Sequence, residues 1–349
     1  MSDRGHAPGR SSLGAEKDGY RGRLVLVTGA AGFIGSHLVD ALVERGARVR
    51  ALDNLATGSK ENLSHRMGEI EYMEGDIRTM ETCRRACEGA FFVFHQAALG
   101  SVPRSFADPA TTFGVNVAGT ANVFAAARDA KVRRVIYASS SSVYGDSEKL
   151  PKREGEEGKP ISPYALSKAM DEDLAAIFGR CYGMELIGLR YFNVYGPRQD
   201  PDGPYAAVIP RFFKAYFAGE APVIYGDGEQ SRDFTFVEDA VEANLLAAGA
   251  LPAACGRAYN VAGGRRITVN ELASLVREAV GGGPDPRHEA PRPGDVRHSL
   301  ADLSLCAREL AYAPAVELAE GIARSRRHYD EVSVSSHPRR VAPESASGG

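Results

Sequence analysis

The sequence has few cysteines, no long apolar run and no strong excess of charge, and each absence removes a class of protein. Its five cysteines are odd in number and scattered, which favours reduced thiols in a cytosolic protein over a disulfide framework or a zinc site. No apolar run approaches the ~20 residues that cross a bilayer, and residues 1–22 lack the apolar core of a secretory signal. The net charge of −3 gives no electrostatic case for nucleic acid or an anionic membrane as a partner.

Metal ligation is not indicated either. His95 and His298 have no partner ligands at a useful spacing, so both are interpreted as structural and no metal is expected. What is present is an ordinary globular composition, 44% hydrophobic and 25% charged, over 349 residues. Residues 1–22 and 335–349 are polar and are expected to be disordered tails.

The first informative stretch reads as strand, glycine turn and helix. An apolar run at 24–27 leads into the letters TGAAGFIG, and a helical pattern then continues from 36 to 45. Gly29 permits a tight turn, Gly32 lets the backbone approach a pyrophosphate, and Gly35 lets helix and strand pack closely. The helix N-terminus offers N–H groups to the phosphates. This context predicts a dinucleotide-binding site.

A carboxylate in the next strand selects the dinucleotide. The second expected strand, 48–52, ends at Asp53. A carboxylate at this point accepts hydrogen bonds from an adenosine ribose diol and repels a 2′-phosphate. The sequence therefore predicts NAD as the cofactor, in preference to NADP.

Further strands are expected at 69–74, 91–95, 135–138 and 186–192, with a long helix at 116–130 between two of them. The alternation predicts an α/β fold with a doubly wound parallel sheet, a Rossmann fold, whose strand ends share one ligand-binding edge. After Pro197 shorter helices are expected at 208–218, 237–250 and 269–280. We therefore expect an NAD-binding domain at 23–195 and a smaller mixed α/β domain at 196–330 that mainly holds substrate. A segment near 234–262 is expected to return to the first domain.

Catalytic chemistry is indicated between residues 139 and 168. Four serines, 139–142, follow an apolar strand pattern, and Tyr164 and Lys168 are four apart on one face of a helix that Ser162-Pro163 opens. An unperturbed tyrosine titrates near pH ~10 and is a poor base at neutral pH. A lysine ammonium one turn away, together with a cationic nicotinamide ring, would favour the phenolate, and a serine hydroxyl could hold or relay the proton.

Taken together, the motifs resemble the extended short-chain dehydrogenase/reductase family, the NAD-dependent epimerases and dehydratases of nucleotide sugars. The resemblance spans about residues 24–329 and rests on TGAAGFIG, SSSSVYG, SPYALSK, LRYFNVYGPRQDP, AAVIPRF, GDGEQSRDF and RPGDVRHSLAD. Within that family, HQAALGSVPRS, YAAVIP and GDVRHSLADLS look most like UDP-N-acetylglucosamine 4-epimerases.

The resemblance implies roles for matching positions. Tyr164 would be the catalytic base and acid, Lys168 would bind the nicotinamide ribose, and Ser140 would hydrogen-bond the 4-oxygen of the sugar. The expected NAD contacts are Gly29, Gly32, Phe33, Ile34, Gly35, Asp53, Asn54, Gly58, Asp76, Ile77, Gln96, Ala97, Ala98, Asn116, Tyr164, Lys168 and Tyr191. The expected UDP-sugar contacts are Gly100, Ser101, Arg104, Ser140, Ser141, Ser142, Asn193, Ala207, Val208, Tyr225, Arg232, Arg292, Asp295 and Ser299.

The residue types suit a UDP-sugar. Arg232 and Arg292 would meet the diphosphate, because a guanidinium matches phosphate oxygens better than an ammonium does. Asp295 would accept the uridine ribose hydroxyls. Ser299 falls where the glucose/galactose-restricted members carry a bulky tyrosine, so a small residue there leaves room for a 2-acetamido group.

The expected reaction is interconversion of UDP-GlcNAc and UDP-GalNAc, or of UDP-glucose and UDP-galactose, by transient oxidation at carbon 4 with retained NAD. A 4,6-dehydratase would place Asp-Glu where this chain has Ser141-Ser142, and a UDP-glucuronate decarboxylase would place glutamate at Ser142. A UDP-glucuronate 4-epimerase stays open, because Arg104 could meet the carboxylate. The Tyr164/Lys168 pair argues against a non-catalytic NAD-binding protein. The family also implies a homodimer that includes the Tyr164 helix.

Overall fold

The computed structural model describes residues 19–202, 206–291 and 296–336. Most of the two expected tails, 1–22 and 335–349, lies outside these residues. Where they overlap, Tyr20 is buried and its hydroxyl donates to the carbonyl of Leu245 at 3.0 Å, and the last helix runs to Ser336. Tyr20 is thus packed against the rest of the fold, and a helix reaches into the second segment.

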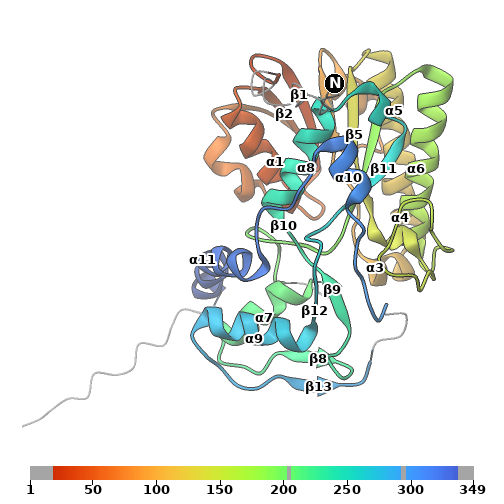
Figure 1. The fold of residues 1–349 in the computed structure, drawn as a ribbon. Coiled ribbons are helices and arrows are strands. Elements are labelled where there is room, and N and C mark those ends of the chain that lie inside the picture. The colour runs from red at the N-terminus through yellow and green to blue at the C-terminus, as the bar shows by residue number, and fades with distance from the viewer. Residues whose placement is uncertain (1–18, 203–205, 292–295, 337–349) are drawn as a thin grey trace, which may run out of the picture.

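A seven-stranded sheet forms the larger part of the molecule (Figure 1). Its strands are β1 Leu24–Thr28, β2 Arg48–Asp53, β3 Ile70–Glu74, β4 Phe92–His95, β5 Arg134–Ser140, β6 Leu186–Tyr191 and β11 Arg257–Val261. They lie in the order β11-β6-β5-β4-β1-β2-β3, and every neighbouring pair is parallel. From β3 at one edge the chain returns to β4 beside β1, so the winding direction reverses between β1 and β4. Ligands bind at such a switch point in open α/β sheets.

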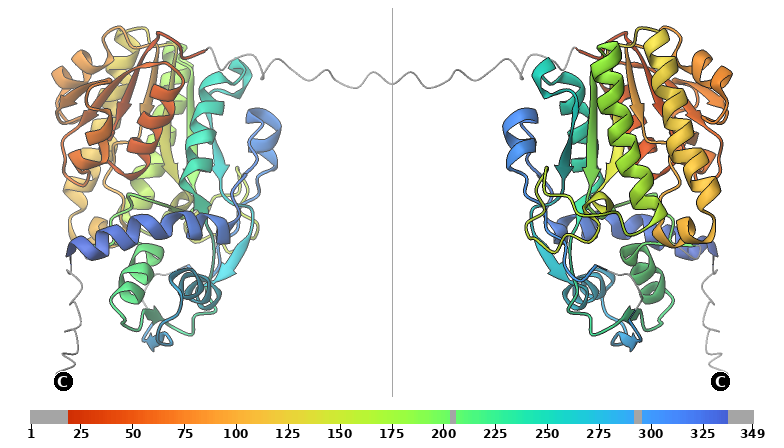
Figure 2. Two further views of the ribbon diagram at one scale, coloured as in Figure 1. Left: turned by 90° about the vertical axis from the view of Figure 1, so that its left-hand side faces the viewer. Right: turned by 90° about the vertical axis from the view of Figure 1, so that its right-hand side faces the viewer.

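Helices cover both faces of this sheet (Figure 2). The connecting elements are α1 Phe33–Glu44, η2 Lys60–Arg66, α2 Met80–Cys87, α3 Val102–Ala107, α4 Pro109–Phe113, η3 Gly114–Gly119, α5 Thr120–Asp129, η4 Ser141–Tyr144, α6 Pro163–Tyr182, α8 Val237–Gly249, η5 Pro252–Ala254 and α10 Ser304–Leu310. Buried side chains of α1, α8 and α10 form one core with one face of the sheet. Those of α2, α5 and α6 form a second core with the other face. The fold is a doubly wound, Rossmann-like α/β fold.

A smaller lobe lies beyond the large sheet (Figure 1). Its elements are β7 Val194–Tyr195, α7 Val208–Phe217, β8 Val223–Tyr225, β9 Ser231–Asp233, β10 Thr235–Phe236, β12 Arg266–Thr268, α9 Val269–Val280, β13 Arg287–Glu289 and α11 Leu318–Ser336. The short strands pair as β7 with β10, β8 with β13, and β9 with β12. Aromatic and aliphatic side chains from α7, α9 and α11 share a third core. Between its elements the chain returns to the large sheet as β11.

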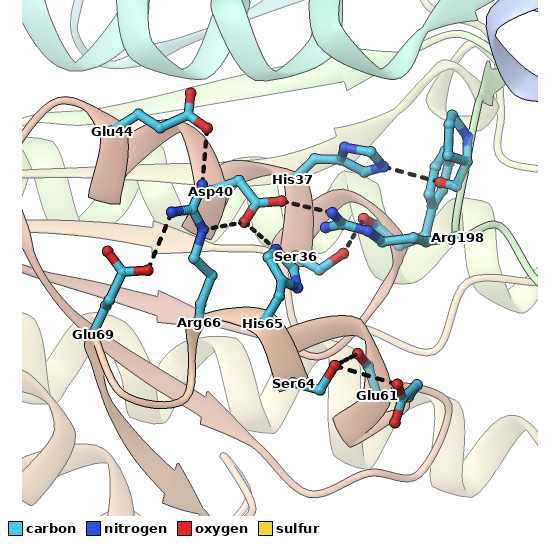
Figure 3. Close-up of polar contacts among 12 residues, drawn as sticks. Ser36, His37, Asp40, Glu44, Glu61, Ser64, His65, Arg66, Glu69 and Arg198 are labelled. Carbon is cyan, nitrogen blue, oxygen red and sulfur yellow. Dashed lines mark hydrogen bonds and ion pairs between the residues drawn. The ribbon is translucent and has the colours of Figure 1, made fainter. Parts of the chain in front are cut away.

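The two lobes are connected by an ionic network on α1 (Figure 3). Asp40 Oδ1 accepts hydrogen bonds from Arg66 Nε at 2.9 Å and from His65 Nε2 at 2.7 Å. Asp40 Oδ2 accepts one from Arg198 Nη2 at 2.7 Å. Arg198 stands in the segment that leads to α7, so this carboxylate anchors the start of the smaller lobe to the nucleotide-binding half.

Most of the strands and helices that the sequence predicted begin and end within one or two residues of the observed bounds, whereas α2, α3, α4, α10, α11 and β11 were not predicted. The main difference is at the helix expected over 116–130, which begins earlier and as a π-helix, Gly114–Gly119, that passes into α5. Among the described residues no helix is both long and apolar enough to span a bilayer.

Candidate active site

The glycine turn after β1 is packed too tightly for side chains. Gly29 has a φ of +67°, and a Cβ added there would lie 2.7 Å from the backbone nitrogen of Ala97. A Cβ at Gly35 would lie 2.0 Å from the carbonyl oxygen of Gly29, which is a clash no side-chain movement could relieve. Gly32 is the N-cap of α1, and Phe33 and Ile34 open the helix. The turn therefore presents bare backbone and a helix N-terminus, which is what a dinucleotide pyrophosphate requires.

Asp53 stands at the end of β2 beside this turn. Its Oδ2 accepts a hydrogen bond from Ala31 N at 2.9 Å and its Oδ1 accepts one from Leu55 N at 2.7 Å. Burial raises the pKa of Asp53, while these two N–H groups act in the opposite direction. The carboxylate is thus fixed against the glycine turn. Gly58 also approaches the turn, since an added Cβ would lie 2.7 Å from the carbonyl carbon of Ala31.

A second acidic group follows β3. Asp76 Oδ2 accepts hydrogen bonds from Asn54 Nδ2 at 2.9 Å and from Arg78 Nη2 at 2.6 Å. The Arg78 guanidinium lowers the pKa of Asp76 to about 2. The neighbouring Ile77 packs against Gly119 of the π-helix, where an added Cβ would lie 2.6 Å from Ile77 Cδ1.

The π-helix η3 carries Asn116 into the interior. Asn116 Oδ1 accepts from Leu99 N at 2.8 Å, and its Nδ2 donates to Ser167 Oγ at 3.0 Å. One amide therefore connects the segment after β4 to the helix of Tyr164. π-helical turns within α-helices are frequent at functional sites because the extra residue redirects a side chain.

A polar group of three side chains lies between the carboxyl ends of β4 and β6. Tyr191 donates to Gln96 Oε1 at 3.2 Å, and Gln96 Nε2 donates to Asn244 Oδ1 at 3.0 Å. Asn244 Nδ2 in turn donates to the Tyr191 hydroxyl at 2.7 Å. The group fixes the start of the loop that continues through Ala97 and Ala98.

His95 is fully enclosed at the end of β4. Its Nδ1 lies 2.7 Å from Thr28 Oγ1 and its Nε2 lies 2.9 Å from Thr120 Oγ1. Burial lowers the pKa of His95 to about 3, so the ring is neutral at physiological pH. In the part of the chain that the structure describes, no group of three or more metal-ligating side chains occurs.

The serine cluster follows β5 directly. Ser140 is the N-cap of η4, and its Oγ accepts from Ser142 N at 3.1 Å. Ser142 Oγ is buried and makes no hydrogen bond within the described residues. A buried hydroxyl without a hydrogen-bond partner costs free energy. A ligand that formed a hydrogen bond with Ser142 Oγ would remove this cost. Ser141 lies between the two in the same turn.

Tyr164 and Lys168 lie on α6, whose first turn is capped as expected. Ser162 Oγ accepts from Ala165 N at 3.1 Å, and Pro163 occupies the first helical position. The Lys168 side chain is 3% exposed, so it faces the interior rather than the solvent. Its Nζ donates to Ala138 O at 2.9 Å and to Asp171 Oδ2 at 3.1 Å. The ammonium has three N–H groups, so one remains available for a ligand.

Buried ion pairs hold α6 against the serine strand. Arg190 of β6 donates from Nε to Glu172 Oε1 at 2.9 Å and from Nη2 to Glu172 Oε2 at 2.7 Å. Ser139 Oγ donates to Glu172 Oε1 at 2.5 Å. A bidentate guanidinium–carboxylate pair is strong and directional, so it sets the position of the Tyr164 helix relative to Ser140.

Several expected substrate contacts converge where the smaller lobe joins the sheet. Asn193 follows β6, and its Nδ2 donates to Asp233 O at 2.8 Å. Arg232 lies on the neighbouring β9, where its Nη1 donates to Ser231 O at 3.0 Å. Ser299 N donates to the same Ser231 O at 3.0 Å, which places residue 299 beside β9.

Other expected contacts border these elements. Ser101 is the N-cap of α3 and accepts from Arg104 N at 3.2 Å, and an added Cβ at Gly100 would meet open space. Ala207 and Val208 begin α7, and Tyr225 ends β8 with the Arg211 guanidinium 5.6 Å from its ring centre. Arg292 and Asp295 lie outside the described residues.

Sequence reasoning missed two buried carboxylates near the site. Asp171 is 1% exposed and pairs with Lys168, and Asp233 is fully buried and accepts from Ala301 N at 3.2 Å. Burial raises the pKa of each to about 6. For Asp171 the signal was its position three residues after Lys168, on the same helix face. For Asp233 the sequence gives no signal, because the backbone that surrounds it comes from distant segments.

Comparison with known proteins places this geometry in a family. The NAD dependent epimerase/dehydratase family matches residues 25–262. The chain is 40% identical over 304 residues to the UDP-glucose 4-epimerase of Mycolicibacterium smegmatis. The aligned part covers 86% of this chain and 96% of that enzyme. It is 32% identical over 346 residues to UDP-glucuronate 4-epimerase 4 of Arabidopsis thaliana, covering 92% of this chain and 78% of that one.

A solved structure agrees over nearly its full length. This is the UDP-N-acetylglucosamine 4-epimerase of Methanobrevibacter ruminantium M1, in complex with UDP-N-acetylmuramic acid. The TM-score is 0.85 at 38% identity, with 89% of this chain and 99% of that chain covered. By sequence and by fold, the chain belongs to the NAD dependent epimerase/dehydratase family, among its UDP-sugar 4-epimerases.

Proposed function

We propose that this NAD-dependent UDP-sugar 4-epimerase interconverts UDP-GlcNAc and UDP-GalNAc, and also accepts UDP-glucose and UDP-galactose. The observation that carries the catalytic assignment is the buried Lys168 ammonium, one helical turn from Tyr164, with one N–H group available. The N-acetylated substrate is supported by the small side chain of Ser299 beside β9 and by similarity to a UDP-N-acetylglucosamine 4-epimerase.

The glycine turn and the strand ends around it would hold NAD. The N–H groups at the start of α1 would meet the pyrophosphate, and Asp53 would accept the adenosine ribose hydroxyls. Asn54, Asp76 and Ile77 would border the adenine. Gln96, Ala97, Ala98, Asn116 and Tyr191 would line the side nearer the nicotinamide. NAD supplies a reversible acceptor for the hydride on carbon 4 of the sugar.

The chain's own residues would move the proton. Tyr164, as phenolate, would take the proton of the 4-hydroxyl as the C4–H bond breaks, so that the alcohol becomes a ketone. Ser140 would hold the same oxygen, and the free N–H of Lys168 would hold the nicotinamide ribose. After the 4-keto sugar has turned over in the pocket, Tyr164 would return the proton as the hydride returns to the opposite face. The proton and the hydride that leave the sugar in the first half of the cycle both return in the second half, so no external reductant is consumed.

The smaller lobe would hold the UDP part, because the hexose itself has to rotate. Arg232, Arg292 and Asn193 would bind the diphosphate, and the side chains at 207–208 and Tyr225 would border the uracil. Asp295 would accept the uridine ribose hydroxyls. Small groups, Gly100, Ser101 and the serines at 140–142, would then face the sugar.

Two other reactions in the family differ at specific positions. Dehydration needs an acid and a base beside Ser140, and this chain has Ser141 and Ser142 there. A uronic acid substrate would need a cation near carbon 6, for which Arg104 on α3 is the candidate. Similarity to a UDP-glucuronate 4-epimerase keeps UDP-glucuronate in the substrate test.

The test is a panel of UDP-GlcNAc, UDP-glucose and UDP-glucuronate, followed by chromatography without added reductant. We expect UDP-GalNAc from UDP-GlcNAc, and protein that carries NAD through purification. Tyr164→Phe, which removes only the hydroxyl, should lower turnover by about 10²–10⁴-fold while NAD stays bound. Conversion of UDP-glucose without any UDP-GalNAc would refute the N-acetyl assignment, and near-normal turnover by the variant would remove Tyr164 from the mechanism.

We further propose that the chain forms a homodimer through α6. Leu166, Met170 and Ile177 leave an apolar stripe on its outer face, and Phe106 of the nearby α3 is 61% exposed. Contiguous exposed apolar side chains of this kind mark protein interfaces. Sedimentation equilibrium should give twice the chain mass of 37.3 kDa.

A further inference from the structure

A buried carboxylate lies directly behind the proposed catalytic lysine. Asp171 follows Lys168 by one helical turn on α6, and its side chain is 1% exposed. Its Oδ2 accepts the hydrogen bond from Lys168 Nζ at 3.1 Å, and its Oδ1 makes no hydrogen bond within the described residues. In the proposed mechanism Lys168 holds the nicotinamide ribose, and its positive charge favours the Tyr164 phenolate. Neither role requires a negative charge next to the ammonium.

The groups that face Asp171 come from every element around it. Thr120 of α5 lies beside Asp171 and also contacts the ring of His95 on β4, which burial keeps neutral. The Tyr137 hydroxyl of β5 is buried nearby, and burial raises its pKa further with a contribution from the negative charge of Asp171. Glu172 on the same helix is neutralised by Arg190 of β6. Lys168 therefore provides the counter-charge of Asp171.

Together, Asp171 and a backbone carbonyl fix the direction of the ammonium. Two of its three N–H groups are used by Ala138 O and Asp171 Oδ2, so the third has a defined direction. We propose that Asp171 is a positioning residue that orients the Lys168 ammonium and, through its negative charge, sets the acidic limit of the pH range in which Tyr164 acts. This inference rests on the proposed roles of Tyr164 and Lys168.

The sign of the electrostatic effect follows from the charges. The ammonium favours the Tyr164 phenolate, and the carboxylate opposes it. Asp171 is seven residues from Tyr164, or about 10 Å along the helix axis. At that distance and an effective dielectric of about 20, a unit charge moves a protonation midpoint by roughly one pH unit. Burial raises the pKa of Asp171 to about 6, so the carboxylate is ionised at neutral pH and the effect is present there.

The experiment compares wild type with Asp171→Asn, which keeps the size and one oxygen acceptor but removes the charge. The turnover number for the accepted UDP-sugar is measured from about pH 5 to about pH 9. We expect the acid-side midpoint of the variant to move to lower pH by roughly one unit. The matched control is Asp173→Asn, an exposed carboxylate on the same helix, whose midpoint should stay in place. A merely structural role would lower the amplitude of the profile without moving its midpoint.

A second readout does not depend on turnover. The absorbance of tyrosinate is titrated in the NAD-bound protein and in the same protein with Tyr164→Phe. The difference between the two curves reports the Tyr164 hydroxyl alone. The difference curve should move to lower pH when Asp171→Asn is present in both proteins. Unmoved curves in both measurements would overturn the inference even if epimerase activity is normal. If no UDP-sugar is converted, the proposed function fails and the absorbance titration still decides the role of Asp171.

Failure of the Asp171 variants to fold would also decide the question. Asp171→Gly, which leaves space for water at the ammonium, carries the same prediction for the midpoint. Bound NAD and the circular dichroism spectrum report whether each variant is folded. If neither variant gives folded, NAD-bearing protein, Asp171 is a structural residue and the inference is wrong.

Discussion

At the scale of single residues, the proposed acceptance of an N-acetylated sugar depends on a small side chain. Ser299 N donates a hydrogen bond to Ser231 O, which holds residue 299 beside β9. We predict that Ser299→Tyr lowers conversion of UDP-GlcNAc by roughly tenfold or more while UDP-glucose is still converted, because only the acetamido group needs the space.

The measurement for Ser299→Tyr is kcat/KM for both sugars, and Ser274→Tyr, at an exposed position on α9, is the control. An equal loss for the two sugars would show that residue 299 does not line the pocket around carbon 2.

The sequence predicts local geometry where a rule on neighbouring residues applies, and it does not reveal which side chains are buried. Gly29 and Gly35 were predicted because a strand, a turn and a helix follow one another in the chain, and the close contacts at both glycines agree with that rule. Asp171 and Asp233 were not predicted: the spacing of Asp171 from Lys168 indicates a shared helix face but not burial, and for Asp233 the sequence gives no signal. Their environment depends on elements that are adjacent only in the fold.

At the scale of elements, α6 has one buried polar face and one exposed apolar face. The inner face presents Lys168 and Asp171 to the sheet, and the outer face carries Leu166, Met170 and Ile177. If α6 pairs with its copy in a second chain, a charge on the outer face is buried without a partner. We predict that Ile177→Lys gives a monomer of 37.3 kDa, whereas Leu251→Lys, a change at a 70% exposed side chain outside α6, keeps the wild-type mass.

Sedimentation equilibrium at several concentrations distinguishes these outcomes. A wild-type chain that is monomeric, or an Ile177→Lys variant with the wild-type mass, would contradict an interface on α6.

The bounds of one helix show what the spacing of apolar residues does not predict. The helix over 116–130 was predicted from its apolar spacing, but its π-helical beginning was not, because one extra residue in a turn hardly changes that spacing.

At the scale of the whole molecule, α1 does more than open the dinucleotide site. It anchors the segment at 197–198 that leads into the smaller lobe, through Asp40 with Arg198 and through His37 with Pro197 (Figure 3). The carbonyl of Pro197 can only accept, so His37 Nε2 carries the proton in this 2.9 Å hydrogen bond. Burial, with a smaller contribution from Arg198, lowers the pKa of His37 to about 4.

This shift predicts a dependence of stability on pH. A histidine whose folded pKa lies below its unfolded value of 6.5 stabilises the fold fully above that value and less as the pH falls towards 4. At pH ~5 the unfolded chain has taken up a proton that the fold excludes, which costs about 2 kcal/mol. Asp171 and Asp233, whose folded pKa values are raised to about 6, act in the opposite direction over an overlapping range. The contribution of His37 is therefore visible only as a difference between wild type and a variant.

We predict that the free energy of unfolding of wild type, relative to His37→Gln, falls by about 2 kcal/mol between pH ~7.5 and pH ~5. The measurement is urea unfolding at both pH values with saturating NAD, followed by circular dichroism. His288→Gln, at an exposed position on β13, is the matched control and should show no such change. If the difference between wild type and His37→Gln were the same at both pH values, His37 would be solvated in the folded protein. The contact between α1 and the segment at 197–198 would then depend on the ion pair of Asp40 with Arg198.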